Sequence, residues 1–353
     1  MRRLDHPRVS AIITTYNCQA FISDAITSVL SQTRPVDEFI IVDDGSTDAT
    51  RTVIQRFSGY GIQLITQENQ GPGAARNTGI RASSGDLIAF LDCDDIWLPH
   101  KTQVQADYLK GWPRDSLVGA HSWWWNTYSD VWTVKRRGIP RGKDKAPEIL
   151  IHNFVGNPSA TLFRRELFEQ VGIFDESLHW GEDWELWMLI LQQLEMGFIP
   201  EPLIIYRWHS GNISHERMWE RFTYLENIAL TQIGAYPHRI QRLFLQGRAK
   251  ARWALERSWH LRSRNAPRIR RLGYLGRAFL YSPFEQLGEK FKLLISTVLG
   301  TTKYRALQDL MARRGSGKSA ARADKDLNKP DCRTLLKPAP GLSYSFCSPE
   351  KAE

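Results

Sequence analysis

The sequence predicts an α/β protein whose first half is a parallel sheet with helices on both faces. Short apolar runs alternate with segments in which apolar residues recur at helical spacing. The connections between these segments are short, which is typical of a parallel sheet with crossover helices. Two of the apolar runs end at acidic clusters. At 353 residues the chain is long enough for one large domain and a smaller appendage.

The first half contains four expected strands and three expected helices. The strands are residues 9–14, 39–42, 62–65 and 87–91. In the first helix one apolar stripe is formed by Phe21, Ile22, Ala25, Ile26, Val29 and Leu30. Ser46 or Thr47 is expected to cap a second helix that carries Val53, Ile54 and Phe57, and residues 74–82 form the third.

The pattern changes after about residue 117. Trp123–Trp125 is consistent with a strand or a loop, residues 159–163 read as a strand, and residues 182–192 read as a helix. A final strand over 198–206 is expected to be broken by Pro200 and Pro202. The predicted domains are a catalytic domain over 1–215, a basic helical extension over 216–314 and a disordered tail over 315–353.

The positive charge is concentrated in the extension. Residues 216–314 contain 20 Lys and Arg against 7 Asp and Glu, a net charge of +13, whereas residues 1–215 carry −6. Such a block favours an acidic partner. Cys18, Cys93, Cys332 and Cys347 have no spacing typical of a disulfide scaffold or a structural zinc site, which fits a reducing compartment. No apolar run has the length of a signal peptide or a membrane span, so we expect a cytoplasmic protein.

The acidic clusters indicate where chemistry takes place, because ligands bind at the carboxyl ends of parallel strands. Asp92, Asp94 and Asp95 follow the fourth strand, where carboxylates are tolerable if Mg²⁺ or Mn²⁺ lies between them and a phosphate. A solvated acidic loop or a helix cap is the structural alternative. Asp43 and Asp44 follow the second strand and suit a nucleotide base or ribose, although Asp and Gly also serve simple turns there.

A glycine-rich segment, Gly71–Asn77, opens the third helix. It matches neither GxGxxG, since Arg76 occupies the third glycine position, nor a Walker loop, so dinucleotide binding is disfavoured. Arg76 fits a cation that faces a diphosphate or a base, with an exposed arginine at a helix start as the alternative. Asp183 and Glu182 open the later helix, where the helix dipole stabilises carboxylates whether or not they are catalytic.

Seven motifs together resemble the family-2 inverting glycosyltransferases with the GT-A fold. They are "VSAIITTYN", "IIVDDGSTD", "NQGPGAARNTGI", "GDLIAFLDCDDIWLP", "GIFDESL", "GEDWELW" and "YRWHSGNIS", and they span about residues 8–215 in the family's order. The resemblance implies a nucleotide-diphosphate sugar donor, Mn²⁺ or Mg²⁺, and inversion at the anomeric carbon.

The resemblance also implies roles for individual residues. Nucleotide-sugar binding falls to Thr14, Tyr16, Asp43, Asp44, Arg76 and Asp92, and metal binding to Asp94, Asp95 and His209. His209 is equally compatible with a solvent-facing loop. Asp183 matches the catalytic base, with Glu182 as an acceptor or sugar contact. Trp184 and Trp124 are expected to contact the acceptor, because aromatic faces commonly bind sugars.

The chain departs from the processive relatives. Ala249 stands where their Gln-x-x-Arg-Trp motif has glutamine, which favours transfer of one sugar to a carbohydrate or lipid-linked acceptor in cell-surface polysaccharide or glycolipid assembly. A catalytically inactive carbohydrate- or nucleotide-binding protein is the alternative. A sugar nucleotidyltransferase is disfavoured because residues 15–18 supply no glycine-rich triphosphate loop.

The basic extension has two interpretations. It is either a helical bundle with solvated arginines or a surface that holds the protein on the inner face of an anionic membrane. Tyr281–Leu299 has a helical apolar stripe beside Lys290 and Lys292, which suits both. Nucleic acid is not an expected partner, because no binding motif for it is present.

Overall fold

The computed structural model describes residues 6–112, 115–135, 145–212, 218–236, 238–264, 266–283 and 286–299. Contacts divide these residues into two compact units. The first holds the residues up to 145 and 154–212, and the second holds 146–153 and the residues from 218 to 299. The expected tail over 315–353 lies outside the described residues.

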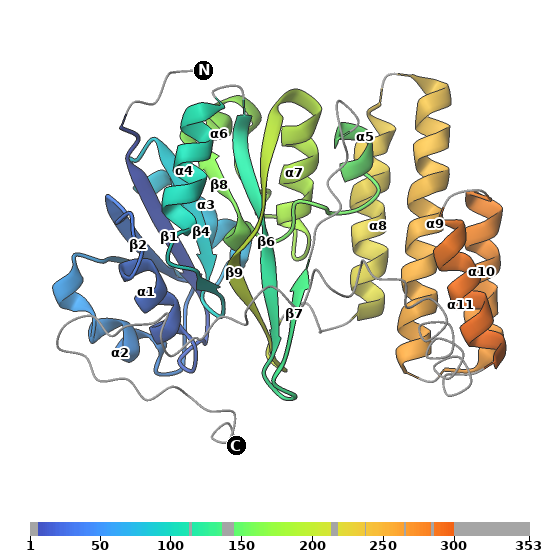
Figure 1. Cartoon of the computed structure of the whole chain (residues 1–353), viewed down its shortest axis with the longest axis horizontal. Helices are drawn as coiled ribbons and strands as arrows, with labels where there is room; N and C mark the ends of the chain where they lie inside the picture. Colours follow the sequence, from blue (N-terminus) through green and yellow to red (C-terminus); the bar gives the residue numbers. More distant parts are fainter. Residues whose placement is uncertain are drawn as a thin grey trace, which may run out of the picture. The chain divides into compact units, whose positions relative to one another are not determined.

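The first unit is built on one mixed sheet with the strand order β3-β2-β1-β4-β8-β6-β9-β5, and β7 pairs with β6 (Figure 1). The strands are β1 Val9–Thr15, β2 Glu38–Asp43, β3 Gln63–Thr66, β4 Leu87–Asp92, β5 Ile96–Trp97, β6 Asp115–Asn126, β7 Val131–Lys135, β8 Leu162–Arg164 and β9 Glu195–Trp208. The helices are α1 Ile22–Leu30, α2 Thr50–Gln55, α3 Pro72–Ala82, α4 Lys101–Gly111, α6 Arg165–Val171 and α7 Glu182–Gln193.

The four predicted N-terminal strands are parallel, as expected. Thr14 of β1 is in register with Val42 of β2 and with Asp92 of β4. The carboxyl ends of β2, β1 and β4 therefore lie at one edge of the sheet. β1 lies between β2 and β4, both of which end at aspartates. Residues 14–17, at the end of β1, therefore lie between the two aspartate clusters.

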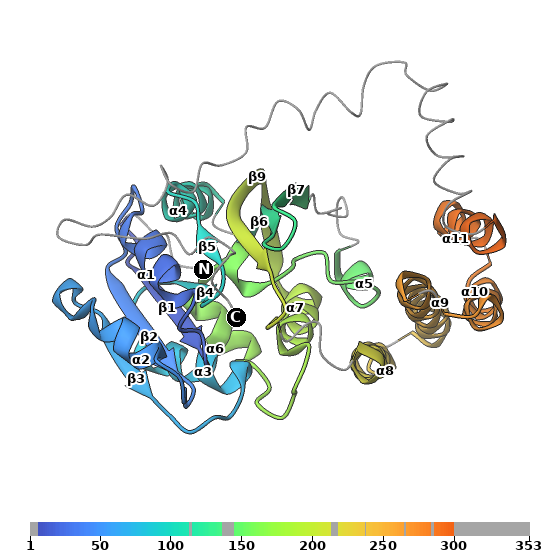
Figure 2. The same ribbon diagram turned by 90° about the horizontal axis from the view of Figure 1, so that it is seen from below.

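Helices cover both faces of this sheet (Figure 2). Alternate residues of β1 such as Ala11 and Ile13 pack in the core that includes α1, α2 and α4. Ile12 points to the opposite face, where a Cβ on Gly79 of α3 would come within 2.4 Å of its side chain. A glycine at position 79 therefore allows α3 to approach β1 closely. This contact holds the helix whose first turn carries Arg76 against the sheet.

The second half of the sheet corrects two expectations and decides one open alternative. Residues 158–160 form a 3-10 turn, and the short strand β8 that follows runs antiparallel to β4 and β6. β9 continues past Pro200 and Pro202, although its register with β6 shifts around His121, as expected where prolines lack a ladder N–H. Trp123–Trp125 belongs to β6, so the strand alternative is correct.

The expected cap of the second helix is also wrong. α2 begins at Thr50, whose backbone N–H donates to the Asp48 carboxylate at 2.9 Å. Ser46 Oγ instead accepts the N–H of Asn17 at 3.0 Å. The serine therefore ties the loop after β1 to the loop after β2, which is a tertiary contact.

The second unit consists of α8 Met218–Gly234, α9 Arg239–Ser263, α10 Arg268–Tyr281 and α11 Leu287–Leu299, with part of α5 Lys145–Ile149. Its core includes Ala254, Leu255, Leu275, Ala278 and Leu293. The apolar stripe predicted over 281–299 is divided between the end of α10 and α11. Among the described residues, no helix combines the length and the apolar character that crossing a bilayer requires.

Candidate functional site

The end of β2 places two aspartates in different surroundings. Asp43 is fully buried, accepts the N–H of Ser46 at 3.1 Å and pairs with Arg51 at 2.6 Å. Asp44 accepts the N–H groups of Gln70 and Gly71 at 3.0 and 2.8 Å. Asp44 therefore fixes the loop that leads into α3, and Asp43 closes the turn after its own strand.

The end of β1 lies between the acidic strands. Thr14 is buried in the strand, whereas Tyr16 is 47% exposed. Asn17 has φ +48°, a left-handed conformation that asparagine tolerates, and its side-chain oxygen accepts the N–H of Thr47 at 2.8 Å. The loop is thus held rigidly, and Tyr16 is the aromatic side chain it presents to solvent.

Arg76 joins two parts of the predicted site. Its guanidinium, on a side chain that is 6% exposed, donates to Asp92 Oδ1 at 2.8 Å and to Glu182 Oε1 at 2.6 Å. Burial alone lowers the pKa of this group, but the charges of Asp92 and Glu182 outweigh burial and hold it above its ordinary value. Arg76 therefore stays charged and connects the end of β4 to the start of α7.

The three aspartates after β4 have different surroundings. Burial raises the pKa of Asp92, with the charge of Arg76 opposing and that of Asp94 reinforcing the shift. Asp95 is fully buried and accepts a bond from Asn157 at 2.7 Å. Burial and the charges of Asp94 and Asp92 raise its pKa well above the usual range. Asp94 is partly exposed and lies beside His209, whereas Asp95 is buried.

Asp94 meets two residues from the end of β9. Its Oδ2 lies 3.1 Å from His209 Nε2 and accepts a bond from the Asn212 amide at 2.9 Å. The N–H of Gly211 donates to His209 Nδ1 at 3.2 Å. Because Nδ1 is an acceptor, the neutral ring carries its proton on Nε2 and donates it to Asp94. Sequence analysis missed Asn212, although it lies in the same motif as His209.

Metal binding at this place requires help from the substrate. Among the residues that the structure describes, no group of three or more His, Cys, Asp and Glu side chains is placed to hold a metal ion. Asp94, His209 and Asn212 supply one carboxylate, one imidazole and one amide. Such a partial set fits Mg²⁺ or Mn²⁺, which commonly take one or two carboxylates together with substrate phosphates.

The start of α7 carries the predicted base. Gly181 precedes the helix with φ +77°, and the half-buried Asp183 accepts the N–H of Trp184 at 2.6 Å. Glu185, which sequence analysis missed, is 9% exposed, and burial together with the charge of Asp175 raises its pKa to about 7. Its position two residues after Asp183 was the signal from which the sequence could have indicated it as a site residue. Three acidic side chains thus occupy the first turn of α7, where the helix dipole favours negative charge.

The two predicted acceptor tryptophans differ in accessibility. Trp184 is 4% exposed, so its ring offers no sugar platform in this structure. Trp124 is partly exposed and contacts the tilted ring of Tyr206 at 4.9 Å and Trp208 edge-to-face at 5.8 Å between ring centroids. Lys135 lies over the Trp124 ring at 4.9 Å, and Trp208 is 39% exposed. Trp208 is the neighbour of His209, so this aromatic cluster adjoins the Asp94 side of the site.

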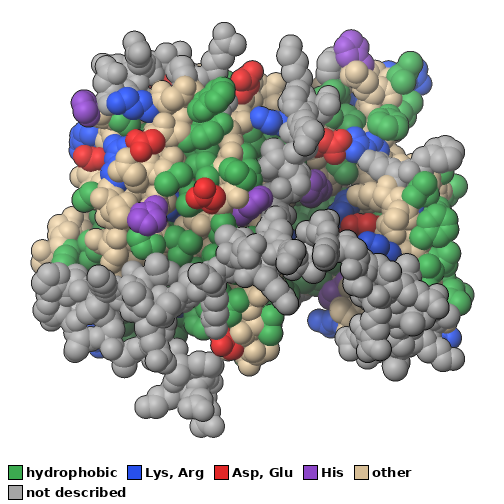
Figure 3. Space-filling view, in the orientation of Figure 1, with side chains coloured by type: hydrophobic (Ala, Val, Ile, Leu, Met, Phe, Trp, Pro, Cys, Tyr) green, Lys and Arg blue, Asp and Glu red, His purple; other side chains and the backbone are tan. Residues whose placement is uncertain are grey.

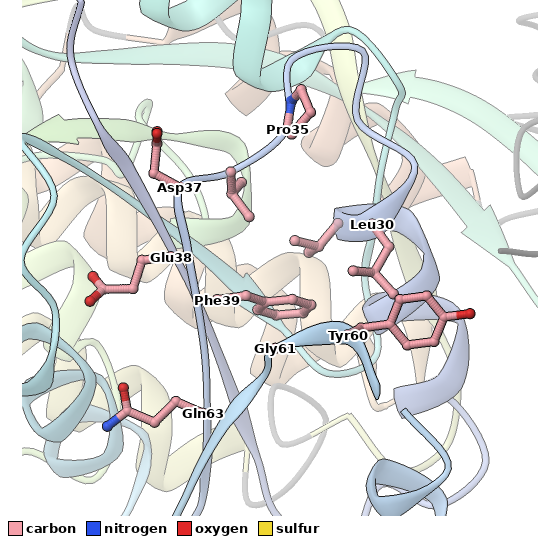
Figure 4. Close-up of a pocket in the computed structure, with 10 residues that line it drawn as sticks. Leu30, Pro35, Asp37, Glu38, Phe39, Tyr60, Gly61 and Gln63 are labelled. Atoms are coloured by element: carbon pink, nitrogen blue, oxygen red, sulfur yellow. The ribbon is translucent and has the colours of Figure 1, made fainter. Parts of the chain in front are cut away.

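A cavity of about 420 Å³ lies elsewhere (Figure 4). It is lined by Leu30 at the end of α1, Asp37 and Phe39 near the start of β2, and Tyr60 and Gln63 near β3. It therefore opens at the amino end of β2, whereas Asp43 and Asp44 follow the carboxyl end. None of the predicted site residues lines it.

Solved structures of low sequence identity share this fold. TarS from S. aureus in complex with UDP-GlcNAc matches with a TM-score of 0.56 and 16% identity, over 88% of this chain and 93% of that one. Mannosyltransferase PcManGT from Pyrobaculum calidifontis, in complex with GDP-Man and Mn²⁺, matches with a TM-score of 0.57 and 20% identity, over 87% and 84%. The predicted GT-A fold is confirmed.

Sequence comparison identifies the family. The model of "Glycosyl transferase family 2" matches residues 10–172, and that of "Glycosyltransferase like family 2" matches residues 142–267. An uncharacterized glycosyltransferase of Nostoc sp., alr2836, is 48% identical over 225 residues, 58% of this chain and 66% of that protein. The β-1,3-glucosyltransferase WfgD of Escherichia coli is 32% identical over 229 residues, 62% of this chain and 83% of WfgD. The chain belongs to glycosyltransferase family 2.

Proposed function

We propose that this glycosyltransferase moves a single sugar from a nucleotide-diphosphate donor to an acceptor hydroxyl, with inversion at the anomeric carbon. The supporting observation is the pair of ion pairs made by Arg76, at 2.8 Å to Asp92 and 2.6 Å to Glu182. They keep Asp92, and with it the Asp92–Asp94 segment after β4, beside the first turn of α7. A donor-binding side and a base-bearing side thus adjoin each other.

The nucleotide lies across the ends of β2 and β1. Tyr16 is exposed there, and the buried Thr14 and Asp44 hold the loops that shape the surface. The solved neighbours TarS and PcManGT are complexes with UDP-GlcNAc and with GDP-Man, which supports a nucleotide-sugar donor without selecting its base or sugar.

Asp94, with His209 and Asn212, would hold Mn²⁺ or Mg²⁺ on the diphosphate side. A divalent ion supplies Lewis-acid stabilisation of charge on a leaving phosphoryl oxygen. To bind the ion through Nε2, the neutral ring of His209 must carry its proton on Nδ1 instead. Nδ1 then no longer accepts the N–H of Gly211, so that hydrogen bond must break or rearrange. Asp92 does not bind the ion, because its carboxylate is paired with Arg76.

Asp183 acts as the general base. The acceptor hydroxyl attacks the anomeric carbon from the face opposite the diphosphate, and Asp183 takes its proton. Glu182, locked to Arg76, positions this turn of the helix. General base catalysis typically contributes ~10²–10⁴-fold, and orientation supplies much of the rest.

The acceptor is a carbohydrate or a lipid-linked carbohydrate of the cell surface, and the Trp124 cluster contributes to its binding. WfgD is named as acting on GlcNAc-diphosphoundecaprenol, which supports a lipid-linked acceptor. A membrane-bound acceptor would require the protein to work at the membrane surface.

The decisive experiment measures thermal unfolding with UDP, GDP and dTDP, each with and without Mn²⁺. At least one diphosphate is expected to stabilise the protein only with metal, by ~2.7 kcal/mol at about 100 times its dissociation constant, because it binds the folded state alone. Asp94→Asn should abolish that shift. The control Asp107→Asn, at an exposed position on α4, should keep it. Metal-independent stabilisation by every diphosphate would contradict the assignment of Asp94.

A further inference from the structure

The second unit has a groove that the transfer reaction does not use. Its volume is about 370 Å³, and its lining comes from three helices: Trp219 of α8, Leu261 of α9, and Arg270, Gly273, Tyr274 and Arg277 of α10. The Trp219 and Tyr274 rings lie 5.6 Å apart, and the Arg277 guanidinium lies 5.2 Å from the Tyr274 ring centre. The groove therefore combines two aromatic rings with two cations.

The charge of this surface has one sign along α10. Arg268, Arg270, Arg271 and Arg277 belong to this helix, which contains no acidic residue. Arg270 and Arg277 are two helical turns apart, so they lie on the same side of α10. Guanidinium groups bind phosphate oxygens with paired hydrogen bonds. The groove thus fits a phosphate group.

An apolar ridge adjoins the groove on the same helix. Ile269, Leu272 and Leu280 recur at helical spacing on the next side of α10 and are 76%, 37% and 77% exposed. Figure 3 shows hydrophobic side chains gathered over the α10 region at one margin of the molecule. Large apolar side chains at this exposure indicate a surface that binds something apolar.

The apolar surface extends to the neighbouring helix. Phe279 of α10 contacts Phe291 of α11, with 6.1 Å between ring centroids. On α11, Phe291, Ile295 and Val298 are 51%, 39% and 57% exposed, and their spacing places them on one side. Two amphipathic helices therefore present apolar stripes bordered by basic residues.

We propose that this surface docks the protein on a bilayer that contains anionic phospholipid. Arg270 and Arg277 bind headgroup phosphates in the groove, Trp219 and Tyr274 lie at the headgroup level, and the α10 ridge enters the boundary of the acyl chains. Apolar residues bordered by cations match the profile of an anionic membrane surface. A nucleic acid would use the arginines but leave the ridge in water, and a protein partner does not account for three exposed arginines on a helix without a carboxylate.

The inference does not depend on the transfer mechanism, so it is tested without donor or acceptor. The full chain is floated with vesicles of phosphatidylcholine alone or with about one third phosphatidylglycerol. We expect binding to the anionic vesicles only, reduced by raised salt. Arg270→Gln/Arg277→Gln should weaken it about tenfold or more, since each basic residue near an anionic surface contributes about fivefold and two are removed. Arg56→Gln/Arg239→Gln removes the same charge at other exposed positions and should change binding less than threefold.

Two further variants separate the groove from the ridge. A Cβ on Gly273 meets no atom within 4 Å, so Gly273→Glu fits the helix and places a carboxylate in the groove. It should weaken binding as much as the arginine pair while the melting temperature stays unchanged. Leu272→Ser/Leu280→Ser should reduce insertion measured by vesicle quenching of Trp219.

The proposal would be overturned if both groove variants bound the vesicles as well as the wild-type protein does. It would also be overturned if the wild-type protein bound equally well to vesicles with and without phosphatidylglycerol. Dissociation of a dimer by the ridge variant without any vesicle binding would instead identify a second copy of this chain as the occupant. Transfer to a soluble acceptor should be unchanged in all variants, so a failure here is distinguishable from a failure of the proposed reaction.

Discussion

The guanidinium of Arg76 lies between carboxylates from two elements, Asp92 at the end of β4 and Glu182 at the start of α7. A buried ion pair adds little net stability when complete, but removal of one partner leaves an uncompensated buried charge. Here two acidic groups would lose their partner at once. The arrangement makes the geometry of the site depend on one side chain.

Arg76→Gln is therefore expected to lower the free energy of unfolding by ~3–5 kcal/mol, the usual cost of breaking a buried pair. Urea unfolding measures it. Arg81→Gln, on the same helix, breaks the exposed pair with Glu176 and should cost at most about 1 kcal/mol. Equal losses in the two variants would show that the Arg76 pairs contribute no more than a surface ion pair.

Asp183→Asn removes the proposed base while it keeps the size of the side chain. Donor affinity should stay within about threefold, and the rate of transfer should fall by ~10²–10⁴-fold, the contribution expected of a general base. Isothermal titration and a transfer assay give the two quantities. Glu169→Gln, exposed on α6, is the control, and turnover like that of the wild type in Asp183→Asn would remove the base assignment.

Glu185 predicts a dependence of stability on pH. Burial raises its folded-state pKa from 4.5 to about 7, so the folded protein binds a proton that the unfolded chain has released. Its contribution is complete below pH ~4.5 and is lost as pH rises through about 7. Glu185→Gln should remove this part of the slope and gain relative stability above pH 7, of the order of 2 kcal/mol. Urea midpoints across this range measure it, and an identical slope in the variant would contradict the shift.

At the level of elements, the hairpin β6–β7 and the end of β9 form one aromatic unit. Trp124 contacts both Tyr206 and Trp208, while Trp125 stacks on Trp132 at 5.0 Å. Both indoles of the second pair donate to Asp130 in the turn, at 3.0 and 2.9 Å. The turn thus fixes the hairpin, and the hairpin supports Trp124 next to the exposed Trp208.

If this unit binds the acceptor, Trp208→Ala should raise the acceptor KM about tenfold and leave donor binding unchanged, since aromatic contacts contribute 1 kcal/mol or somewhat more. Steady-state kinetics in which each substrate is varied in turn measures the KM of the acceptor and that of the donor separately. Trp112→Ala is a matched control, because Trp112 is 61% exposed and stacks on Tyr108 at the end of α4. A parallel rise in donor KM would indicate damage to the Asp94–His209 contact instead.

The elements differ in how well sequence predicts them. β1, β2 and β4 were predicted because strands buried on both faces are continuously apolar. The strand β8 was misplaced because its three residues follow a 3-10 turn whose residues are buried as well. The continuity of β9 through Pro200 and Pro202 depends on the irregular register with β6, which no local pattern encodes.

On the scale of the whole molecule, the charge division follows the two compact units. The basic surplus of residues 216–314 belongs largely to helices of the second unit, and the acidic clusters belong to the sheet of the first. This opposite charge of the two units is consistent with the two proposals, in which one unit binds a metal-bearing diphosphate and the other an anionic surface.

The amino-acid sequence by itself determined the parallel half of the sheet, the places of Asp44, Asp92, Asp94 and Asp183, and the glycosyltransferase family, because these depend on local patterns and motifs. Only the tertiary structure decided which acids meet which partners. Asp95 and Trp184 are buried, which no local pattern predicts. Arg76 contacts Glu182 across 106 residues, and His209 contacts Asp94 across 115. Such pairs form because strand ends and helix starts that are distant in the chain meet at one edge of the sheet, and spacing along the sequence carries no record of that edge.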